Sequence, residues 1–184
     1  EQLGSMLDKS KRLETLVTAV GRALELDDAE LAVASRAAHL CKADLATQLV
    51  VELTSLQGLM GREYARRSGE EEAVAEAIYE HYLPRSADDD LPRGKAGLAI
   101  GLADRLDTLA GLFAAGLAPT GTKDPFAQRR AALGLAQCLA RLNLDFNLRE
   151  GWARAGQRLP VEAAADPQAA CLDFIVGRLR AYLM

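Results

Sequence analysis

Two acidic residues, Asp104 and Asp107, have the type and spacing that can carry chemistry. They stand three apart in a helical pattern and so share one helix face, where paired carboxylates can bind a metal ion or exchange protons. Salt bridging is the alternative interpretation, with Arg105 and Lys95 available in the sequence. Asp44, on an earlier helix, can meet Asp104 in space because helices in a bundle pair their faces. Such a cluster can also serve only to fix the register of the helices.

The segment 119–130 places hydroxyl groups and basic side chains in a glycine-containing loop just before a helix. Exposed backbone N–H groups at a helix N-terminus, together with hydroxyls and an ammonium group, favour an anion site. The segment is not a P-loop, because the order G-x-x-x-x-G-K-[ST] is absent. The alternative is a structural loop pinned by Asp124 and Pro125. The candidate residues are Thr120, Thr122, Lys123, Arg129 and Arg130.

The charge is distributed unevenly along the chain. The net charge is −4, which taken alone argues against nucleic-acid binding. Residues 1–118 carry a balance of −7, residues 119–160 a balance of +4 and the last 24 residues a balance of −1. A basic segment on an acidic protein can attract a polyanion locally, and it can equally be a solvated helix face.

The elements that must position these residues are predicted to be helices. The chain has 184 residues, among them 34 Ala and 31 Leu against only 11 Val and Ile together, a composition that favours helix over sheet. Apolar spacing and breaker residues predict helices over about 5–25, 31–65 (two helices or one kinked helix), 70–82, 95–115, 125–142, 148–155 and 168–183. Pro125 is expected as the first residue of its helix. The prediction is an all-α protein, with a single helical bundle over 1–142 and a helical extension over 143–184.

The three cysteines are predicted to be free buried thiols. Their number is odd, none lies in a C-x-x-C motif, and the chain has only two histidines, His39 and His81, so a zinc site is not indicated. Free thiols favour a reducing compartment, and no run of about 20 apolar residues or secretory signal is present. We therefore expect a soluble, cytoplasmic protein without a membrane partner. The cysteines are Cys41, Cys138 and Cys171.

Three strings in these segments resemble one known family. LCKADLATQLVVELTSLQGLMGREYA (40–65), ADRLDTLAGLF (103–113) and PTGTKDPFAQRRAA (119–132) are similar to the central HD-like helical domain of the β subunit of bacterial tetrameric glycyl-tRNA synthetase. LGSMLDKSKRL (3–13), with Asp8, Lys9 and Arg12, resembles the start of that domain, and the match covers most of residues 4–135. Beyond about Leu142 the resemblance thins. DFIVGRLRAYL (173–183) resembles the segment leading toward the family's anticodon-binding region, so we expect a fragment of a larger subunit.

The resemblance implies a role in charging tRNA(Gly) with glycine. In the family, the α subunit uses ATP and Mg²⁺ to form the glycyl adenylate, and the β subunit mainly binds tRNA. The implied partners are tRNA(Gly), the α subunit and other β-subunit domains, with no DNA partner and no cofactor on this fragment. Besides the five candidates in 119–130, Arg93 and Lys95 are expected to contact tRNA phosphates.

HD domains are also related to metal-dependent phosphohydrolases, whose metal site uses an upstream His, a His-Asp pair and a distant Asp. Here Ala43-Asp44 stands at the His-Asp position, and Asp104 matches the distant Asp. His39 precedes the motif by about one helical turn, and it is expected either in that pocket or packed in the core. Because imidazole is a preferred ligand of such metals, its loss predicts a vestigial, metal-free and catalytically inert site.

Two alternatives stay open at this point. The first is an active phosphohydrolase that holds a divalent metal with Asp44, Asp104 and His39. The second is a helical spacer that docks the α subunit or other β-subunit domains through exposed apolar residues near Trp152 or on the final helix.

Overall fold

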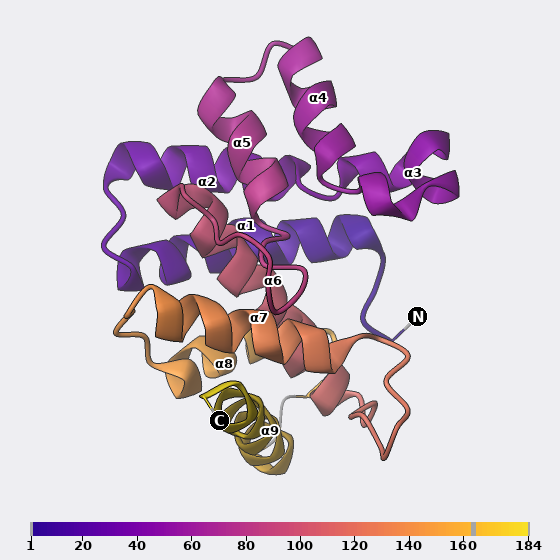
Figure 1. Cartoon of the computed structure of the whole chain (residues 1–184), viewed down its shortest axis with the longest axis vertical. Helices are drawn as coiled ribbons and strands as arrows, with labels where there is room; N and C mark the ends of the chain where they lie inside the picture. The colour runs from indigo at the N-terminus through magenta and orange to yellow at the C-terminus, as the bar shows by residue number, and fades with distance from the viewer. Residues whose placement is uncertain (1, 163–164, 184) are drawn as a thin grey trace.

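The computed structural model describes residues 2–162 and 165–183, and the regular elements in these ranges are all helices (Figure 1). The predicted all-α class is therefore confirmed. The α-helices are α1 (Met6–Ala23), α2 (Asp28–Leu40), α3 (Gln48–Glu52), α4 (Leu59–Arg67), α5 (Glu72–Glu80), α6 (Lys95–Ala114), α7 (Gln128–Arg141), α8 (Leu148–Gly156) and α9 (Ala165–Leu183). Two short 3-10 helices are η1 (Ala43–Ala46) and η2 (Thr54–Leu56).

Helix α6 is the centre of the fold, and 15 of its 20 residues are buried. It contacts α1 and α2 on one side, α5 near its start, and α7, α8 and α9 on the other side. Figure 1 shows α1 and α2 side by side, α4 and α5 at one end of the molecule, and α8 and α9 at the other. A helix surrounded in this way must be apolar on all sides, as the Leu- and Ala-rich sequence of α6 is.

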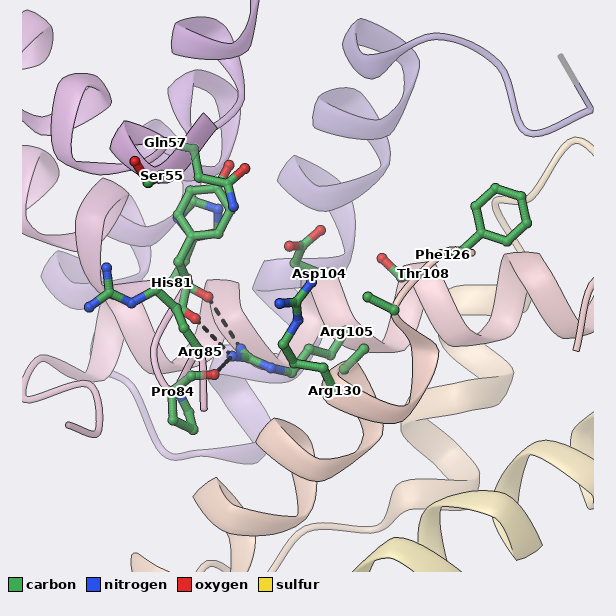
Figure 2. A pocket seen from close by; sticks show the side chains of 13 residues that line it. Ser55, Gln57, His81, Pro84, Arg85, Asp104, Arg105, Thr108, Phe126 and Arg130 are labelled. Atoms are coloured by element: carbon green, nitrogen blue, oxygen red, sulfur yellow. Dashed lines mark hydrogen bonds between the residues drawn. The ribbon is translucent and has the colours of Figure 1, made fainter. Parts of the chain in front are cut away.

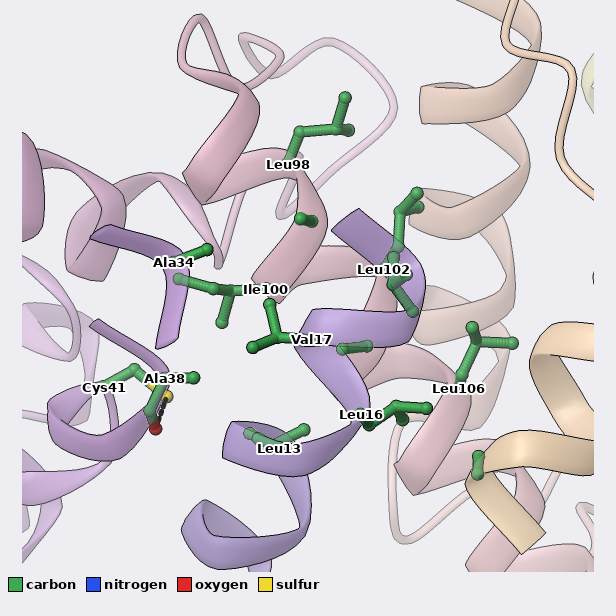
Figure 3. Packing of buried hydrophobic residues seen from close by; sticks show 14 of the residues in the cluster. Leu13, Leu16, Val17, Ala34, Ala38, Cys41, Leu98, Ile100, Leu102 and Leu106 are labelled. Carbon is green, nitrogen blue, oxygen red and sulfur yellow. Dashed lines mark hydrogen bonds between the residues drawn. The ribbon is translucent and has the colours of Figure 1, made fainter. Parts of the chain in front are cut away.

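The core around α6 is built from the apolar stripes that the sequence predicts. Helix α1 begins at a capping box in which Ser5 accepts from the backbone of Asp8 and Asp8 accepts from that of Ser5. Figure 3 shows the apolar face of α1 packed against α6 and against the small residues of α2. The labelled residues are Leu13, Leu16, Val17, Ala34, Ala38, Cys41, Leu98, Ile100, Leu102 and Leu106.

The predicted helical segment 31–65 is more broken than expected. Helix α2 ends at Leu40, and a 3-10 helix, a five-residue helix and a second 3-10 helix precede α4. The break has a physical reason, because Asp44 is turned inward and accepts hydrogen bonds from the backbone N–H groups of Gly58 and Gly61, at 2.7 and 3.1 Å. Gly58 has φ +77°, a conformation that glycine adopts without strain.

The predicted start of α7 at Pro125 is wrong, since the helix begins at Gln128. Ala127, at the N-cap position, has φ 53°, and its side chain makes no cap. The cap comes from Asp124, whose carboxylate accepts from the backbone N–H groups of Gln128 and Arg129 at 2.8 and 2.9 Å. The carboxylate satisfies two of the free N–H groups that every helix N-terminus carries.

Helices α8 and α9 share the core of the preceding helices. Trp152 is 2% exposed and Ile175 is 1% exposed, and both belong to the cluster that contains α6. Of the two places that the spacer alternative names for exposed apolar residues, Trp152 is itself buried, whereas Val176 and Leu183 on the final helix are exposed. In the described ranges, no helix has the length and apolar character needed to cross a membrane.

Candidate functional site

A cluster of charged residues lies between α1, the end of α2, the end of α5 and α6. Helix α6 contributes Asp104 and Asp107, which face the same side as the sequence predicts. Helix α1 brings Lys9 and Arg12, one turn apart, against that side. These partners stand 95 to 98 positions before the carboxylates in the sequence, so no local pattern announces the pairing.

Both carboxylate oxygens of Asp107 are bound by side chains of α1. Arg12 binds it with two nitrogen atoms, Nε at 2.7 Å from Oδ1 and Nη2 at 3.1 Å from Oδ2. Lys9 Nζ lies 2.8 Å from Oδ2 and also donates to Thr108 Oγ1 at 2.8 Å. A two-pronged arginine–carboxylate contact of this kind fixes orientation as well as charge. Asp107 is therefore a positioning group between helices.

Asp104 lies between two ammonium groups. Lys42 Nζ is 2.8 Å from its Oδ2 atom, and Lys9 Nζ is 2.9 Å from its Oδ1 atom. Lys42 Nζ is also 2.9 Å from Nε2 of His81 and 4.4 Å from the centroid of the Tyr82 ring. An imidazole nitrogen, a carboxylate oxygen and an aromatic face thus converge on one ammonium group.

The neutral imidazole of His81 accepts a hydrogen bond from the charged Lys42 ammonium group. Its Nδ1 atom donates to the carbonyl of Ile78 at 2.5 Å, which leaves Nε2 free to accept from Lys42. Burial lowers the pKa of His81 well below its ordinary value, and the neighbouring Lys42 charge acts in the same direction. From the sequence, His81 is recognised only as one of two histidines, and no pattern places it in the site. Its contact with Lys42 joins residues 39 apart, which no spacing rule reveals.

The ion pair between Lys42 and Asp104 stays charged despite its burial. Burial would raise the pKa of the Asp104 carboxyl, but Lys42 and Lys9 hold this pKa well below its usual range. Burial likewise opposes the charged form of Lys42, yet Asp104 raises the pKa of Lys42 above its ordinary value. Burial also raises the pKa of the adjacent Tyr82 hydroxyl to about 12. At neutral pH the site therefore holds two cations around one anion, beside neutral imidazole and phenol groups.

A pocket of about 460 Å³ opens beside this cluster (Figure 2). His81, Asp104 and Thr108 line its inner part, and Arg130 from α7 points across it toward Asp104. Its lining residues are Ser55, Gln57, His81, Tyr82, Pro84, Arg85, Asp104, Arg105, Thr108, Phe126, Ala127, Arg130 and Ala131. Three arginines thus border one pocket, two of them far from 119–130 in the sequence.

Arg105 supports the pocket without pairing to a carboxylate. Its guanidinium donates to the backbone carbonyls of Gly101 and of residues 81–84, at 2.9 to 3.2 Å. These contacts hold the turn after α5 against α6, as the dashed lines in Figure 2 show for part of the set. Burial lowers the pKa of the Arg105 guanidinium below its ordinary value. A salt bridge between Arg105 and Asp104 or Asp107, which the sequence allows, is therefore not formed.

The other two residues assigned to the HD-type site lie apart from this cluster. Asp44 is buried, but its Oδ2 atom faces the backbone N–H groups of Gly58 and Gly61. His39 is neither in the pocket nor packed in the core, since its side chain is 46% exposed and pairs with Glu14 at 3.2 Å. In the part of the chain that the structure describes, no group of three or more His, Cys, Asp or Glu side chains is arranged to hold a metal ion.

The atoms that would hold a metal at Asp104 do not fit that role here. The carboxylate oxygen and the imidazole nitrogen that converge there already contact the ammonium group of Lys42. A divalent cation would have to displace a buried positive charge to reach them. The donor set thus suits a fixed ammonium group better than an exchangeable metal.

The loop before α7 presents part of the predicted basic surface. Lys123, Thr120 and Thr122 are exposed, and a two-residue bridge joins the backbones of Thr120 and Lys123. Arg129 donates to the carbonyl of Gly121 at 2.5 Å, which ties the start of α7 to this loop. The anion-site interpretation relies on the N-terminal N–H groups of α7, and two of these, from Gln128 and Arg129, already bind Asp124.

Arg93 and Lys95 lie at the other end of α6. This helix has 20 residues, so its ends are separated by about 30 Å. Lys95 forms an ion pair with Glu30 on α2 at 3.4 Å, and the backbone of Arg93 donates to Glu80. The seven residues predicted to contact tRNA therefore do not form one compact patch.

The three cysteines, Cys41, Cys138 and Cys171, are free and buried, as the sequence predicts. Burial raises the pKa of Cys41 to about 11 and that of Cys171 to about 12. Thiols with raised pKa values in apolar surroundings are poor nucleophiles. They belong to the core and not to the site.

Comparison with known proteins decides the family. A sequence model described as "Glycyl-tRNA synthetase beta subunit" matches residues 1–184. The chain belongs to the glycyl-tRNA synthetase β subunit family. The match also includes the segment beyond Leu142, where the resemblance seen in the sequence thins.

Two relatives illustrate the similarity within the glycyl-tRNA synthetase β subunit family. The "Glycine--tRNA ligase beta subunit" of Desulforudis audaxviator is 50% identical over 184 residues, and the protein of the same description from Chromohalobacter salexigens is 46% identical over 186 residues. These alignments cover 98% and 99% of this chain but only 27% and 26% of the relatives. The chain thus spans about a quarter of their length.

Proposed function

We propose that the chain serves the charging of tRNA(Gly) with glycine as a non-catalytic, HD-type helical part of a glycyl-tRNA synthetase β subunit. Family membership supports the general role. In this proposal the α subunit holds ATP, Mg²⁺ and glycine, while this chain contacts tRNA or supports the other β-subunit domains. The site needs no cofactor of its own.

The main support for a non-catalytic role is the position of Lys42. Its ammonium group contacts both the Asp104 carboxylate and the His81 imidazole, the two groups that converge as metal ligands would. A fixed cation there gives the structural benefit of a metal, since it neutralises the buried carboxylate and joins α6 to the end of α2. It cannot bind and activate a water molecule as a metal does.

The proposed contact with RNA rests on two basic side chains of the +4 segment: Lys123, which is exposed, and Arg129, which is partly exposed and lies 3.8 Å from Asp124. Lys123 and Arg129 lie at the loop before α7, with the hydroxyls of Thr120 and Thr122 beside them. Lysine and arginine bind phosphates without reading sequence, and such contacts weaken as salt rises. Arg93 and Lys95, at the far end of α6, would form a separate and weaker contact, because Lys95 is paired with Glu30.

The test is the affinity of the 184-residue chain for a tRNA(Gly) transcript between about 50 and 200 mM salt. The double variant Lys123→Gln/Arg129→Gln should bind more weakly and lose about one unit of salt slope for each lost phosphate contact. The control Lys11→Gln/Arg67→Gln makes the same charge change at exposed residues of α1 and α4. Equal binding by the two double variants, or an affinity that does not change with salt, would overturn the proposed RNA contact.

The alternative of an active phosphohydrolase is not favoured by any contact. His39 is exposed and Asp44 faces a backbone turn, so neither joins Asp104. A metal analysis and a generic phosphatase assay on the purified chain test this point directly. A stoichiometric metal together with turnover would require the non-catalytic proposal to be abandoned.

A further inference from the structure

The pocket beside Asp104 carries more positive than negative charge. Asp104 and Asp107 are contacted by three cations, Lys9, Arg12 and Lys42. Arg105 and Arg130 line the same pocket and add two further positive charges, and this excess remains when Asp44 is counted. Arg85 at the rim is balanced by Asp89 at 2.9 Å. Arg105 is buried and its charge is met by backbone carbonyls, whereas the Arg130 side chain is exposed at the open side of the pocket. The excess of positive charge along the pocket wall favours a negatively charged ligand.

Arg130 is the cation best placed to meet such a ligand. It projects from the first turn of α7 into the pocket, and among the described residues it forms no ion pair or side-chain hydrogen bond. Its neighbour Arg129 behaves differently, since its guanidinium is held by the carbonyl of Gly121. The Asp104 carboxylate, toward which Arg130 points, is already paired with Lys42 and Lys9. A bound anion would therefore meet the unpaired guanidinium of Arg130, and the Asp104 carboxylate would not repel it strongly because its charge is already neutralised.

The rest of the pocket suits a small polar molecule with an aromatic part. Ser55 and Gln57 bring a hydroxyl and an amide to one wall, and the ring of Phe126 is 49% exposed at the opposite rim. The volume of about 460 Å³ lies within the range of small-molecule sites. Phosphate is bound by arginine together with hydroxyl and amide donors, and nucleobases stack on aromatic rings.

We propose that this pocket binds the phosphate group of a nucleotide, with Arg130 as its principal ligand and Gln57 and Ser55 as additional donors. The nucleotide is either an unpaired residue of RNA or a free nucleotide, since both present the same chemistry. In the RNA case this inference rests on the proposed function and places one of its contacts in the pocket. The residues of the loop before α7 would then hold neighbouring phosphates.

The experiment is a titration of the isotopically labelled 184-residue chain with AMP and with inorganic phosphate at constant ionic strength, followed by NMR. We expect saturable shifts of the amide signals around 55–57, 81–85 and 126–131. The variant Arg130→Gln should weaken AMP binding about tenfold, because one charge-assisted hydrogen bond is lost. The control Arg149→Gln removes the same charge from an exposed position on α8 and should change the affinity less than twofold.

Competition with the tRNA(Gly) transcript separates the two sources of the nucleotide. Displacement of AMP by tRNA indicates that RNA fills the pocket, and AMP binding that tRNA does not affect indicates a free nucleotide, so either result supports the pocket. The absence of AMP and phosphate binding at millimolar concentration, or equal losses in Arg130→Gln and Arg149→Gln, would overturn it. These outcomes do not depend on Lys123 and Arg129, so the RNA contact of the proposed function can fail separately.

Discussion

Lys42 is the residue on which the charged cluster depends. A buried ammonium is costly unless it is paired, and here Asp104 supplies the charge while His81 supplies an uncharged acceptor. The lysine precedes the Ala-Asp pair that resembles a metal-binding motif, and its side chain supplies a positive charge where such a motif would hold an ion. The buried carboxylate of Asp104 is thus neutralised by a fixed ammonium group from the turn after α2.

The first prediction concerns the removal of this cation. Lys42→Met keeps the length of the side chain but leaves His81 Nε2 without a donor and Asp104 with Lys9 as its remaining partner. The free energy of unfolding should fall by about 3 kcal/mol, as expected when one member of a buried ion pair is deleted. Urea denaturation measures this change, and Lys11→Met on the exposed face of α1 is the control. A loss no larger than that of the control would mean that the cluster does not stabilise the fold.

The second prediction concerns acid stability. The pKa of His81 lies well below its ordinary value of 6.5 in the folded chain, so below pH 6.5 the unfolded chain binds a proton that the folded chain does not. The free energy of unfolding should therefore fall by up to about 1.4 kcal/mol per pH unit between pH 6.5 and 5. The lowered pKa of Asp104 also stabilises the folded chain, but this stabilisation is lost only at lower pH, below the ordinary aspartate pKa of 3.8.

Urea denaturation at several pH values measures this slope. His81→Gln should remove it, and His39→Gln should not, because His39 is exposed and pairs only with Glu14 among the described residues. A slope that survives in His81→Gln would assign the acid sensitivity to other groups.

At the residue scale, the sequence predicts the carboxylates better than their partners. The three-residue spacing of Asp104 and Asp107 correctly places them on one helix face, and salt bridging, the structural interpretation, describes what they do. Their partner Lys9 lies on α1 and their partner Lys42 in the turn after α2, while His81, which binds Lys42, follows the last residue of α5. Such pairings follow from how helices pack, and a single sequence contains no local sign of them.

Among the elements, α6 packs closely against the end of α5 and the turn after it because Gly97 and Gly101 have no side chain. A Cβ atom at Gly101 would lie 2.9 Å from the carbonyl oxygen of His81 and 2.8 Å from Arg105 Nη1. A Cβ atom at Gly97 would lie 2.6 Å from the Cβ atom of Glu80. These two glycines, four residues apart, form the groove that brings His81 to the cluster.

The third prediction compares two glycine-to-alanine changes in helices. Gly101→Ala should destabilise the fold, since about 2 kcal/mol of overpacking exceeds the gain of about 1 kcal/mol in helix propensity. Gly177→Ala on α9 should stabilise it by up to about 1 kcal/mol, because a Cβ atom there meets nothing within 4 Å. Thermal unfolding of both variants gives the two signs. Stabilisation by Gly101→Ala would mean that the turn is not packed as closely as described.

The elements also show where sequence patterns stop being sufficient. The start of α1 is predicted within about a residue, because its capping residue Ser5 is local. The start of α7 is missed by three residues, since Asp124 caps it from outside the usual position. The segment 43–56 is irregular because the buried carboxylate of Asp44 binds a distant turn, a contact that apolar periodicity does not reveal.

At the scale of the whole molecule, the last two helices complete the core instead of leading away from it. The predicted division at residue 142 remains untested, but α8 and α9 contact α6, α7 and α1, and Phe174 lies 5.5 Å from Phe113 between ring centroids. The basic segment 119–160 crosses the same boundary and includes Arg149 and Arg154 on α8. The packing of the core is therefore shared across the predicted boundary.

The fourth prediction follows from this sharing. A chain that ends at residue 142 lacks Trp152, Cys171 and Ile175, whose burial contributes about 1.5–3 kcal/mol for each large apolar side chain. The total is comparable with the whole stability of an ordinary domain, so 1–142 should lose its cooperative thermal transition in circular dichroism. Addition of the separate segment 143–184 should restore the transition, because the missing contacts are then supplied in trans. A cooperative melt of 1–142 alone, close to that of the full chain, would establish residues 1–142 as an independent domain and α8 and α9 as an appendage.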